Sequence, residues 1–288
     1  MVSLPTPRLL PLLLVTLSCW LSSCSGLITN SVIQPAIGNL QQQTDIDLVC
    51  EGAPAYLLMI DSMLVSSPES RKLLLIATQS YSAYAATLSE CDSTQEERVS
   101  RIAAKARDYG LRLLDHYLPV KSGQDTRALE KALADLTKGD VADVFWGTYG
   151  WLIWVTSQKG SPASIADIVP IEKIMARLLE LDESFQGGSI HLFFGSYHAA
   201  KPAMFGGKPD VSRMHFEKAL KLSDRRFLLT QVTYAETLAR TTMDMELHDR
   251  LLNEVMSFPL KNAPEFGLSN RIAVNRARKL LEENYFGD

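Results

Sequence analysis

The segment Phe145-Trp146-Gly147-Thr148-Tyr149 has a second copy farther along the chain, Phe193-Phe194-Gly195-Ser196-Tyr197. In each copy, large aromatic residues precede a glycine, and a tyrosine follows it at helical spacing. A glycine on one helix lets a second helix approach closely, while the flanking aromatic side chains fill the groove beside it. The two copies therefore predict packed helical hairpins.

Helical periodicity continues through the rest of the chain. From about Asp45 onward, apolar residues recur at three- and four-residue steps between short breaks rich in Pro, Gly, Ser and Asp. Because alternating apolar and polar segments are almost absent, the pattern predicts an all-α chain. We expect helices at residues 52–66, 71–88, 95–118, 125–136, 141–158, 165–181, 188–204, 210–223, 227–241, 244–257 and 264–286.

A second motif extends the hairpin prediction. Ser212, Phe216 and Ala219 follow one another at steps of four and three, the small, aromatic, small pattern of the second helix in a tetratricopeptide (TPR) unit. The connection at residues 204–209 is longer than a standard repeat of about 34 residues allows. We therefore predict an α-solenoid of degenerate TPR-like helical hairpins, which forms a single domain over residues 45–288.

The N-terminal segment has the features of a lipoprotein signal peptide. A single basic residue, Arg8, precedes an apolar run from Leu9 to Leu17, and small residues lead directly to Cys24. Because the run is too short to span a bilayer, we interpret residues 1–23 as a cleaved signal and Cys24 as the lipidated first residue of the mature chain. An ordinary secretory signal with a fortuitous cysteine is the alternative.

The segment after Cys24 suggests where the protein lies in the cell. Residues 24–44 are polar with interspersed isoleucine, valine and leucine, so we expect an acylated N-terminus and a docked linker. Several acyl chains anchor a protein far more firmly than one. Ser25 follows the cysteine, which favours the periplasmic face of the outer membrane by the usual lipoprotein sorting rule. We expect no second segment capable of crossing a membrane.

Charge and cysteine content limit the possible partners and bonds. The chain has 29 Lys and Arg against 33 Asp and Glu, a net charge of −4, which argues against nucleic acid as a partner. Cys19 leaves with the signal and Cys24 is acylated, so Cys50 and Cys91 remain. In an oxidising compartment these two could form a disulfide, and two separate buried thiols are the alternative.

The sequence contains no recognisable catalytic motif, cofactor-binding motif or metal-binding motif. A nucleophile elbow, a Walker loop, a dinucleotide fingerprint and a zinc protease motif are all missing, so we predict no enzyme and no cofactor. No cysteine or carboxylate completes a zinc-like set with the histidines, so we predict no metal site. The turn containing Gly206 and Gly207 lacks P-loop spacing, and we interpret it as a connector and not as an anion cradle.

One predicted helix is unusually rich in aromatic residues. Between Phe145 and Trp154 it is apolar nearly all round, so it must be buried centrally or face a cavity or a subunit contact. Aromatic residues at helical spacing are also ordinary core residues, and this alternative stays open for each one. The candidates for lining a ligand channel are Tyr81, Tyr84, Trp146, Tyr149, Trp151, Trp154, Phe193 and Tyr197.

Several segments together resemble the TatT family, the lipoprotein T component of TRAP-associated transport systems. The more specific parts are the Gly206-Gly207 pair with its flanks and the segment around Asn270, and one departure from the family pattern is His248 in place of an aromatic residue. Gly195, Phe216 and Ala219 belong to the same resemblance. The matching segments are residues 57–61, 68, 73–75, 194–200, 202–207, 212–220, 232–235, 244, 251–255, 268–273, 276–277 and 280–281.

The resemblance implies an accessory transport protein. It implies a solenoid of cryptic TPR units, self-association as a trimer, and a cavity or channel lined by apolar side chains. The implied partner is a periplasmic TRAP-type substrate-binding protein, which delivers a small organic ligand to a permease. The residues by themselves support a lipid-anchored helical repeat protein that presents a surface to a partner. The alternative function is therefore an envelope scaffold for outer-membrane or cell-wall assembly.

Overall fold

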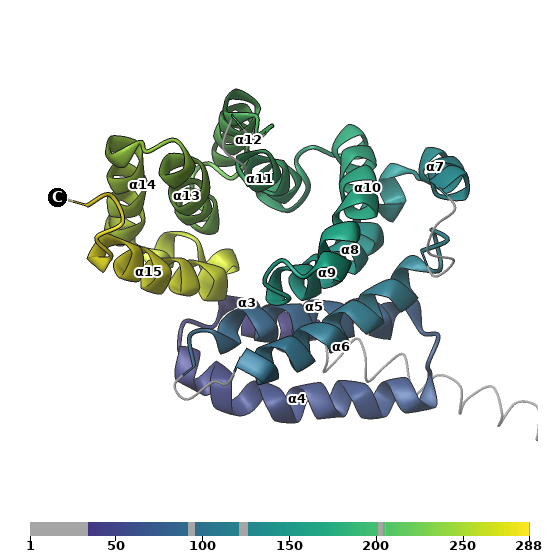
Figure 1. Ribbon diagram of the computed structural model, residues 1–288. Helices are drawn as coiled ribbons and strands as arrows, with labels where there is room; N and C mark the ends of the chain where they lie inside the picture. The colour runs from purple at the N-terminus through teal and green to yellow at the C-terminus, as the bar shows by residue number, and fades with distance from the viewer. Residues whose placement is uncertain (1–33, 92–95, 121–125, 201–203, 205, 288) are drawn as a thin grey trace, which may run out of the picture. The chain divides into compact units, whose positions relative to one another are not determined.

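The computed structural model describes residues 34–91, 96–120, 126–200, 204 and 206–287, and within these residues every regular element is helical (Figure 1). The all-α prediction is thus confirmed. The chain divides into two compact units, residues 1–40 and 41–288. Helix α3 (Gln34–Gln42) holds the described part of the first unit. Cys24 and the signal segment lie outside the described residues, so lipidation stays a prediction.

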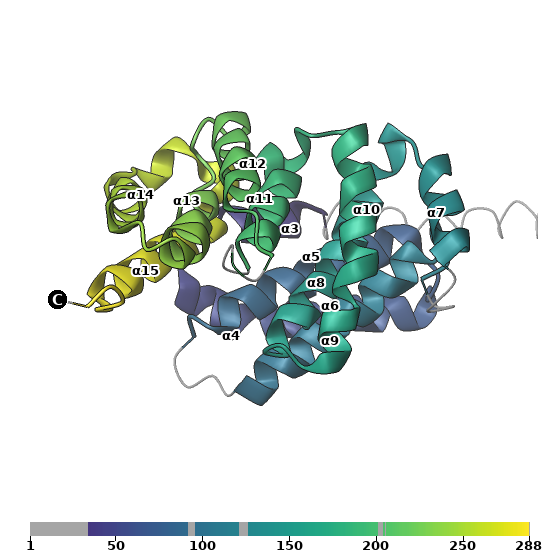
Figure 2. The same cartoon turned by 45° about the horizontal axis from the view of Figure 1, so that its top comes forward.

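The second unit begins with three long helices packed side by side (Figures 1 and 2). These are α4 (Ile46–Ser66), α5 (Arg71–Leu88) and α6 (Glu96–Leu114). Asp45 and Ser70 cap the first two helices by accepting a hydrogen bond from the backbone N–H three residues later. Such caps satisfy donors that a helix N-terminus otherwise leaves unpaired. The predicted helix at 52–66 therefore starts six residues earlier, directly after its cap.

By length and composition, α4 is also apolar enough to cross a membrane, with a mean hydropathy of 1.5. Our expectation that no second segment would meet this criterion was wrong. One side of α4 contributes Val49, Leu57 and Ile60 to the core against α5, but only 28% of its apolar window is buried, whereas the core helix of a soluble protein is mostly buried. A membrane-spanning helix and a core helix of a soluble protein can share this length and composition, and only their packing distinguishes them.

The middle of the unit is built on a close helix crossing. The elements are α7 (Thr126–Asp135), η2 (Lys138–Asp140), α8 (Val141–Ser157), α9 (Pro162–Ala166) and α10 (Ile168–Leu181). Helix α8 packs along α6, where a methyl group on Gly110 would lie 2.5 Å from the carbonyl oxygen of Gly147. Only glycine fits at this approach, which is the role that the repeated motif predicts for Gly147.

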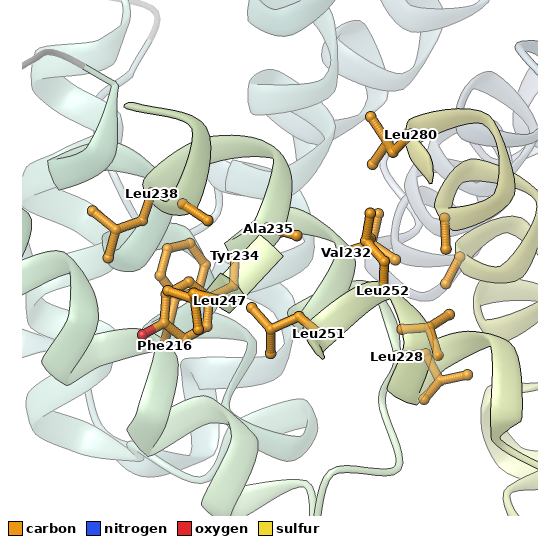
Figure 3. Packing of buried hydrophobic residues seen from close by; sticks show 14 of the residues in the cluster. Phe216, Leu228, Val232, Tyr234, Ala235, Leu238, Leu247, Leu251, Leu252 and Leu280 are labelled. Atoms are coloured by element: carbon orange, nitrogen blue, oxygen red, sulfur yellow. The ribbon is translucent and has the colours of Figure 1, made fainter. Parts of the chain in front are cut away.

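The last part of the unit has its own core (Figure 3). Its elements are α11 (Phe185–Ala199), α12 (Pro209–Leu222), α13 (Leu229–Tyr234), the π-helical η4 (Ala235–Ala239), α14 (Met245–Ser257), η5 (Leu260–Asn262), η6 (Pro264–Phe266) and α15 (Gly267–Glu282). The rings of Phe216 and Tyr234 stack with centroids 4.5 Å apart. Val232 and Leu252 are fully buried in the same cluster.

Several details go beyond the sequence predictions. The single helix expected at 227–241 is an α-helix that continues into one π-helical turn. The start of α11 is a left-handed turn, with φ of 49° at Gln186, 64° at Gly187 and 85° at Gly188. In the structure a disulfide joins Cys50 to Cys91. The TPR-like character of the hairpins and the domain start at residue 45 stay predictions.

Candidate functional site

The second unit encloses a cavity of about 920 Å³ between its middle and last helices. Figure 1 shows α11 between α10 and α13, and all three helices contribute to the wall. Most lining side chains are aromatic or aliphatic. They include Phe145, Trp146, Tyr149, Leu152 and Ile153 from α8, Ile165 from α9, Ile168, Val169 and Met175 from α10, Leu192, Phe193 and Tyr197 from α11, and Leu229 and Phe266.

Two helix faces supply the aromatic part of the wall. On α8, Trp146, Tyr149 and Ile153 recur at steps of three and four, which places them on one side of the helix. The rings of Trp146 and Tyr149 meet edge to face with centroids 5.5 Å apart. On α11, Phe193 stacks with Tyr197 at 5.9 Å. Such contacts hold the rings in defined orientations, so the apolar wall is preformed.

The polar part of the wall is smaller and lies on connecting segments and helix ends. It includes Gln41, Gln186, Ser189, Ser196, His198, Lys208, Thr233, Glu265 and Ser269. Glu265 already accepts a hydrogen bond from Arg226, with 2.6 Å between Nη1 and Oε1. A pocket of mostly apolar walls with a few polar groups is the usual form of a site for small organic molecules.

Comparison with known proteins decides the family. Residues 42–286 match the model of a family described as the TRAP transporter T-component. The chain belongs to the TRAP transporter T-component family. The resemblance drawn from the sequence is thus confirmed, and the protein is an accessory component of a TRAP transport system in the cell envelope. The chain is also 24% identical over 258 residues to an uncharacterized protein of Treponema pallidum (strain Nichols). The aligned region covers 83% of this chain and 79% of the relative.

In this T-component, the structure separates the aromatic candidates into two groups. Trp146, Tyr149, Phe193 and Tyr197 line the cavity. The others, Tyr81, Tyr84, Trp151 and Trp154, do not line it. Burial alone raises the pKa of Tyr149, as expected for a phenol in an apolar wall.

The remaining candidates have structural partners elsewhere. Trp151 points away from the lining face of α8, and its Nε1 donates to Asp167 Oδ2 at 2.8 Å. Tyr81 and Tyr84 are both 2% exposed on α5, inside the three-helix core of α4, α5 and α6. The Tyr81 hydroxyl donates to Asp61 at 2.9 Å. We therefore exclude Tyr81, Tyr84, Trp151 and Trp154 from the lining candidates.

The family-motif residues mostly build the walls around the cavity. Gly195 and Phe216 form the contact between α11 and α12, and Ala219 is fully buried on α12. Gly206 and Gly207 belong to the cavity wall, and Gly206 adopts a φ of 86° that favours glycine. Asn270 is buried, where its side chain ties α15 to the segment before α13.

Three histidines meet where α11 packs on α12. The Nδ1 atoms of His191 and His215 lie 2.8 Å apart, so one must donate and the other accept. The ring of His198 stacks on that of His215 at 5.8 Å. Burial, followed by the neighbouring His191 and His198, lowers the pKa of His215 to about 4. Within the described residues, no group of three or more His, Cys, Asp and Glu is arranged to hold a metal ion.

Sequence reasoning missed part of the wall. Ile165, Ile168 and Val169 lie at the junction of α9 and α10, where no motif marks them. Lys208 stands in a connector, and only its position next to the cavity distinguishes it from other surface lysines. The motif repeated on α8 and α11 was the sequence signal that identified the main aromatic faces.

Proposed function

We propose that this T-component docks the periplasmic substrate-binding protein of its TRAP system and holds or passes a small hydrophobic ligand through its cavity. The observation that carries the proposal is the preformed aromatic wall of Trp146, Tyr149, Phe193 and Tyr197 around about 920 Å³. This volume falls within the range of roughly 300–1,000 Å³ that is usual for small-molecule sites. A space of this size supports the binding of an organic molecule, because it is larger than a packing defect.

The rim of the cavity supports the docking part of the proposal. Ile165 and Val169 line the cavity and are each 59% exposed, and Tyr197 is 37% exposed. An apolar patch at the edge of a pocket is typical of an interaction surface. If a partner covers this rim, a hydrophobic ligand can move between the two proteins without crossing water. The apolar cavity together with its exposed apolar rim favours ligand transfer over a purely scaffolding role.

The membrane anchor and the oligomer belong to the same proposal. Lipidation at Cys24 would tether the protein to the periplasmic face of the outer membrane, where it meets soluble periplasmic proteins. The suggested trimer comes from the family resemblance alone. Mass spectrometry of the purified lipoprotein, which should show acyl chains on Cys24, tests the anchor. Native mass spectrometry tests the number of subunits.

A binding assay with the substrate-binding protein of the same transport system tests docking. We expect Val169→Glu to weaken binding at least tenfold, because a charge would be buried at an apolar contact. Leu58→Glu is the matched control, since Leu58 on α4 is 66% exposed and lies outside the cavity wall. Failure of the unaltered protein to bind, or equal weakening by both variants, would refute docking at this rim.

A further inference from the structure

The cavity wall contains one basic residue without an acidic partner among the described residues. Its charged members are Lys208 and Glu265, and Arg226 already pairs with Glu265. Lys208 has no ion pair in the part of the chain that the structure describes. Its side chain is exposed, so the ammonium group stays hydrated beside an otherwise apolar space.

A histidine lies directly beside this lysine. The backbone N–H of Lys208 donates to the carbonyl oxygen of His198 at 3.1 Å, which holds the connector against the end of α11. His198 also lines the cavity, and its ring packs against those of Phe194 and His215. Burial, and then the charge of Lys208, lower the pKa of His198, while Glu172 acts in the opposite direction. The imidazole is therefore neutral at pH 7, with one N–H to donate.

Lys208 and His198 thus line the same part of the wall, and the ammonium group of Lys208 is close enough to the His198 ring to lower its pKa. Both groups can donate. Glu265 is the one carboxylate among the described lining residues and pairs with Arg226, and Glu172, whose charge acts on His198, is not among the lining residues. A cationic ligand would be repelled by Lys208, and an uncharged apolar ligand would make no use of either donor. An anion is the charge type that both groups stabilise.

We propose that the cavity binds an amphipathic molecule, with an anionic head group such as a carboxylate held by Lys208 and His198 and an apolar body against the aromatic wall. This inference rests on the ligand-binding part of the proposed function. It also changes the interpretation of the Gly206-Gly207 connector. The turn has no phosphate-binding pattern of its own, but it places Lys208 at the edge of an apolar cavity, where an anionic head stays close to water.

Calorimetric titration with dodecanoate and dodecan-1-ol, below their aggregation limits, tests the proposal. The protein is the mature chain with Cys24→Ser, which keeps every residue of the wall. We expect dodecanoate to bind about fivefold more tightly than dodecan-1-ol. This ratio corresponds to the free energy that one partly exposed ion pair contributes to binding. Lys208→Gln should remove this preference and leave binding of dodecan-1-ol unchanged. Lys221→Gln is the control, because it changes the charge equally at an exposed site on α12 outside the wall. This variant should keep the preference for dodecanoate.

A second variant tests the histidine. His198→Phe keeps a ring of similar shape in the stack but removes its N–H, so it should weaken dodecanoate binding and spare dodecan-1-ol. Equal binding of both probes to the unaltered chain would overturn the head-group assignment, while the hydrophobic cavity function would stand. Binding of neither probe would overturn this inference and the ligand-binding part of the proposed function together. The docking assay is independent of both results.

Discussion

The ring of Phe216 occupies the space that any side chain at Gly195 would need. A methyl group on Gly195 would lie 2.8 Å from Cδ1 of Phe216. Ser212 Oγ donates to the Gly195 carbonyl oxygen at 2.7 Å, so the backbone of α11 is held against α12 at the same point. The contact joins the wall of the cavity to the core around Phe216 and Tyr234.

We predict that Gly195→Leu destabilises the protein by about 1–3 kcal/mol, because overpacking forces α11 and α12 apart. Urea unfolding followed by circular dichroism measures the change. Gly52→Ala is the control, since Gly52 lies exposed on α4 with open space where a methyl group would stand, and it should be neutral or stabilising by about 0.5–1 kcal/mol. An unchanged unfolding midpoint in Gly195→Leu would contradict the close contact.

Asn270 gives a second test of the packing. Its Oδ1 accepts from the backbone N–H of Leu228 and its Nδ2 donates to the carbonyl oxygen of Arg226, both at 2.9 Å. Asn270→Leu would leave the buried N–H of Leu228 and the partly buried carbonyl oxygen of Arg226 without these partners. We expect a loss of about 2–4 kcal/mol in the free energy of unfolding, measured in urea. Asn253→Leu, at an exposed position of α14, should change it far less; equal losses would contradict the role of Asn270.

The helices and their close contacts were predictable because they depend on local spacing. The glycine between aromatic residues indicates that a neighbouring helix approaches closely at Gly195, and the structure shows that Phe216 makes this contact. In contrast, periodicity could not show which side of the aromatic helix α8 faces the cavity, since that helix is apolar nearly all round. For this reason Trp146 and Trp151 were equal candidates, although only Trp146 lines the wall.

The rest of the site depends on contacts distant in sequence. The π-helical turn at Ala235–Ala239 has no local signal, because tertiary packing determines it. Gly187 and Gly188 do indicate a turn, but they do not indicate that the left-handed conformation extends to Gln186. The cavity itself is bounded by side chains from several helices that are far apart in the chain. The role of Lys208 likewise follows from the wall beside it and not from the residues next to it in the chain.

The disulfide between Cys50 and Cys91 should contribute measurably to stability. It links α4 to the segment after α5 and has a sequence separation of 41. Closing a loop of this length restricts the unfolded chain, so reduction should lower the free energy of unfolding by about 2–4 kcal/mol. Urea unfolding with and without reductant measures this loss. The double variant Cys50→Ser, Cys91→Ser should be insensitive to reductant, and an equally insensitive unaltered protein would argue against the bond.

The buried histidine cluster predicts that stability falls in mild acid. The pKa of His215 is lowered to about 4 in the folded chain, against an ordinary value of 6.5. Between these two values the unfolded chain binds more protons, so the free energy of unfolding must decrease as the pH falls from about 6.5 towards 4. The pKa values of His191 and His198 are lowered too, mainly by burial, and they act in the same direction.

Urea unfolding at pH values from 7 to 4.5 measures this dependence above the range where most carboxylates titrate. His215→Gln should flatten it, because the group with the largest resolved shift among the histidines is gone and protonated His191 no longer faces a second imidazole 2.8 Å away. His116→Gln is the control, since His116 is exposed just after the end of α6. The same slope in all three proteins would show that the contact between His191 and His215 does not link folding to protons.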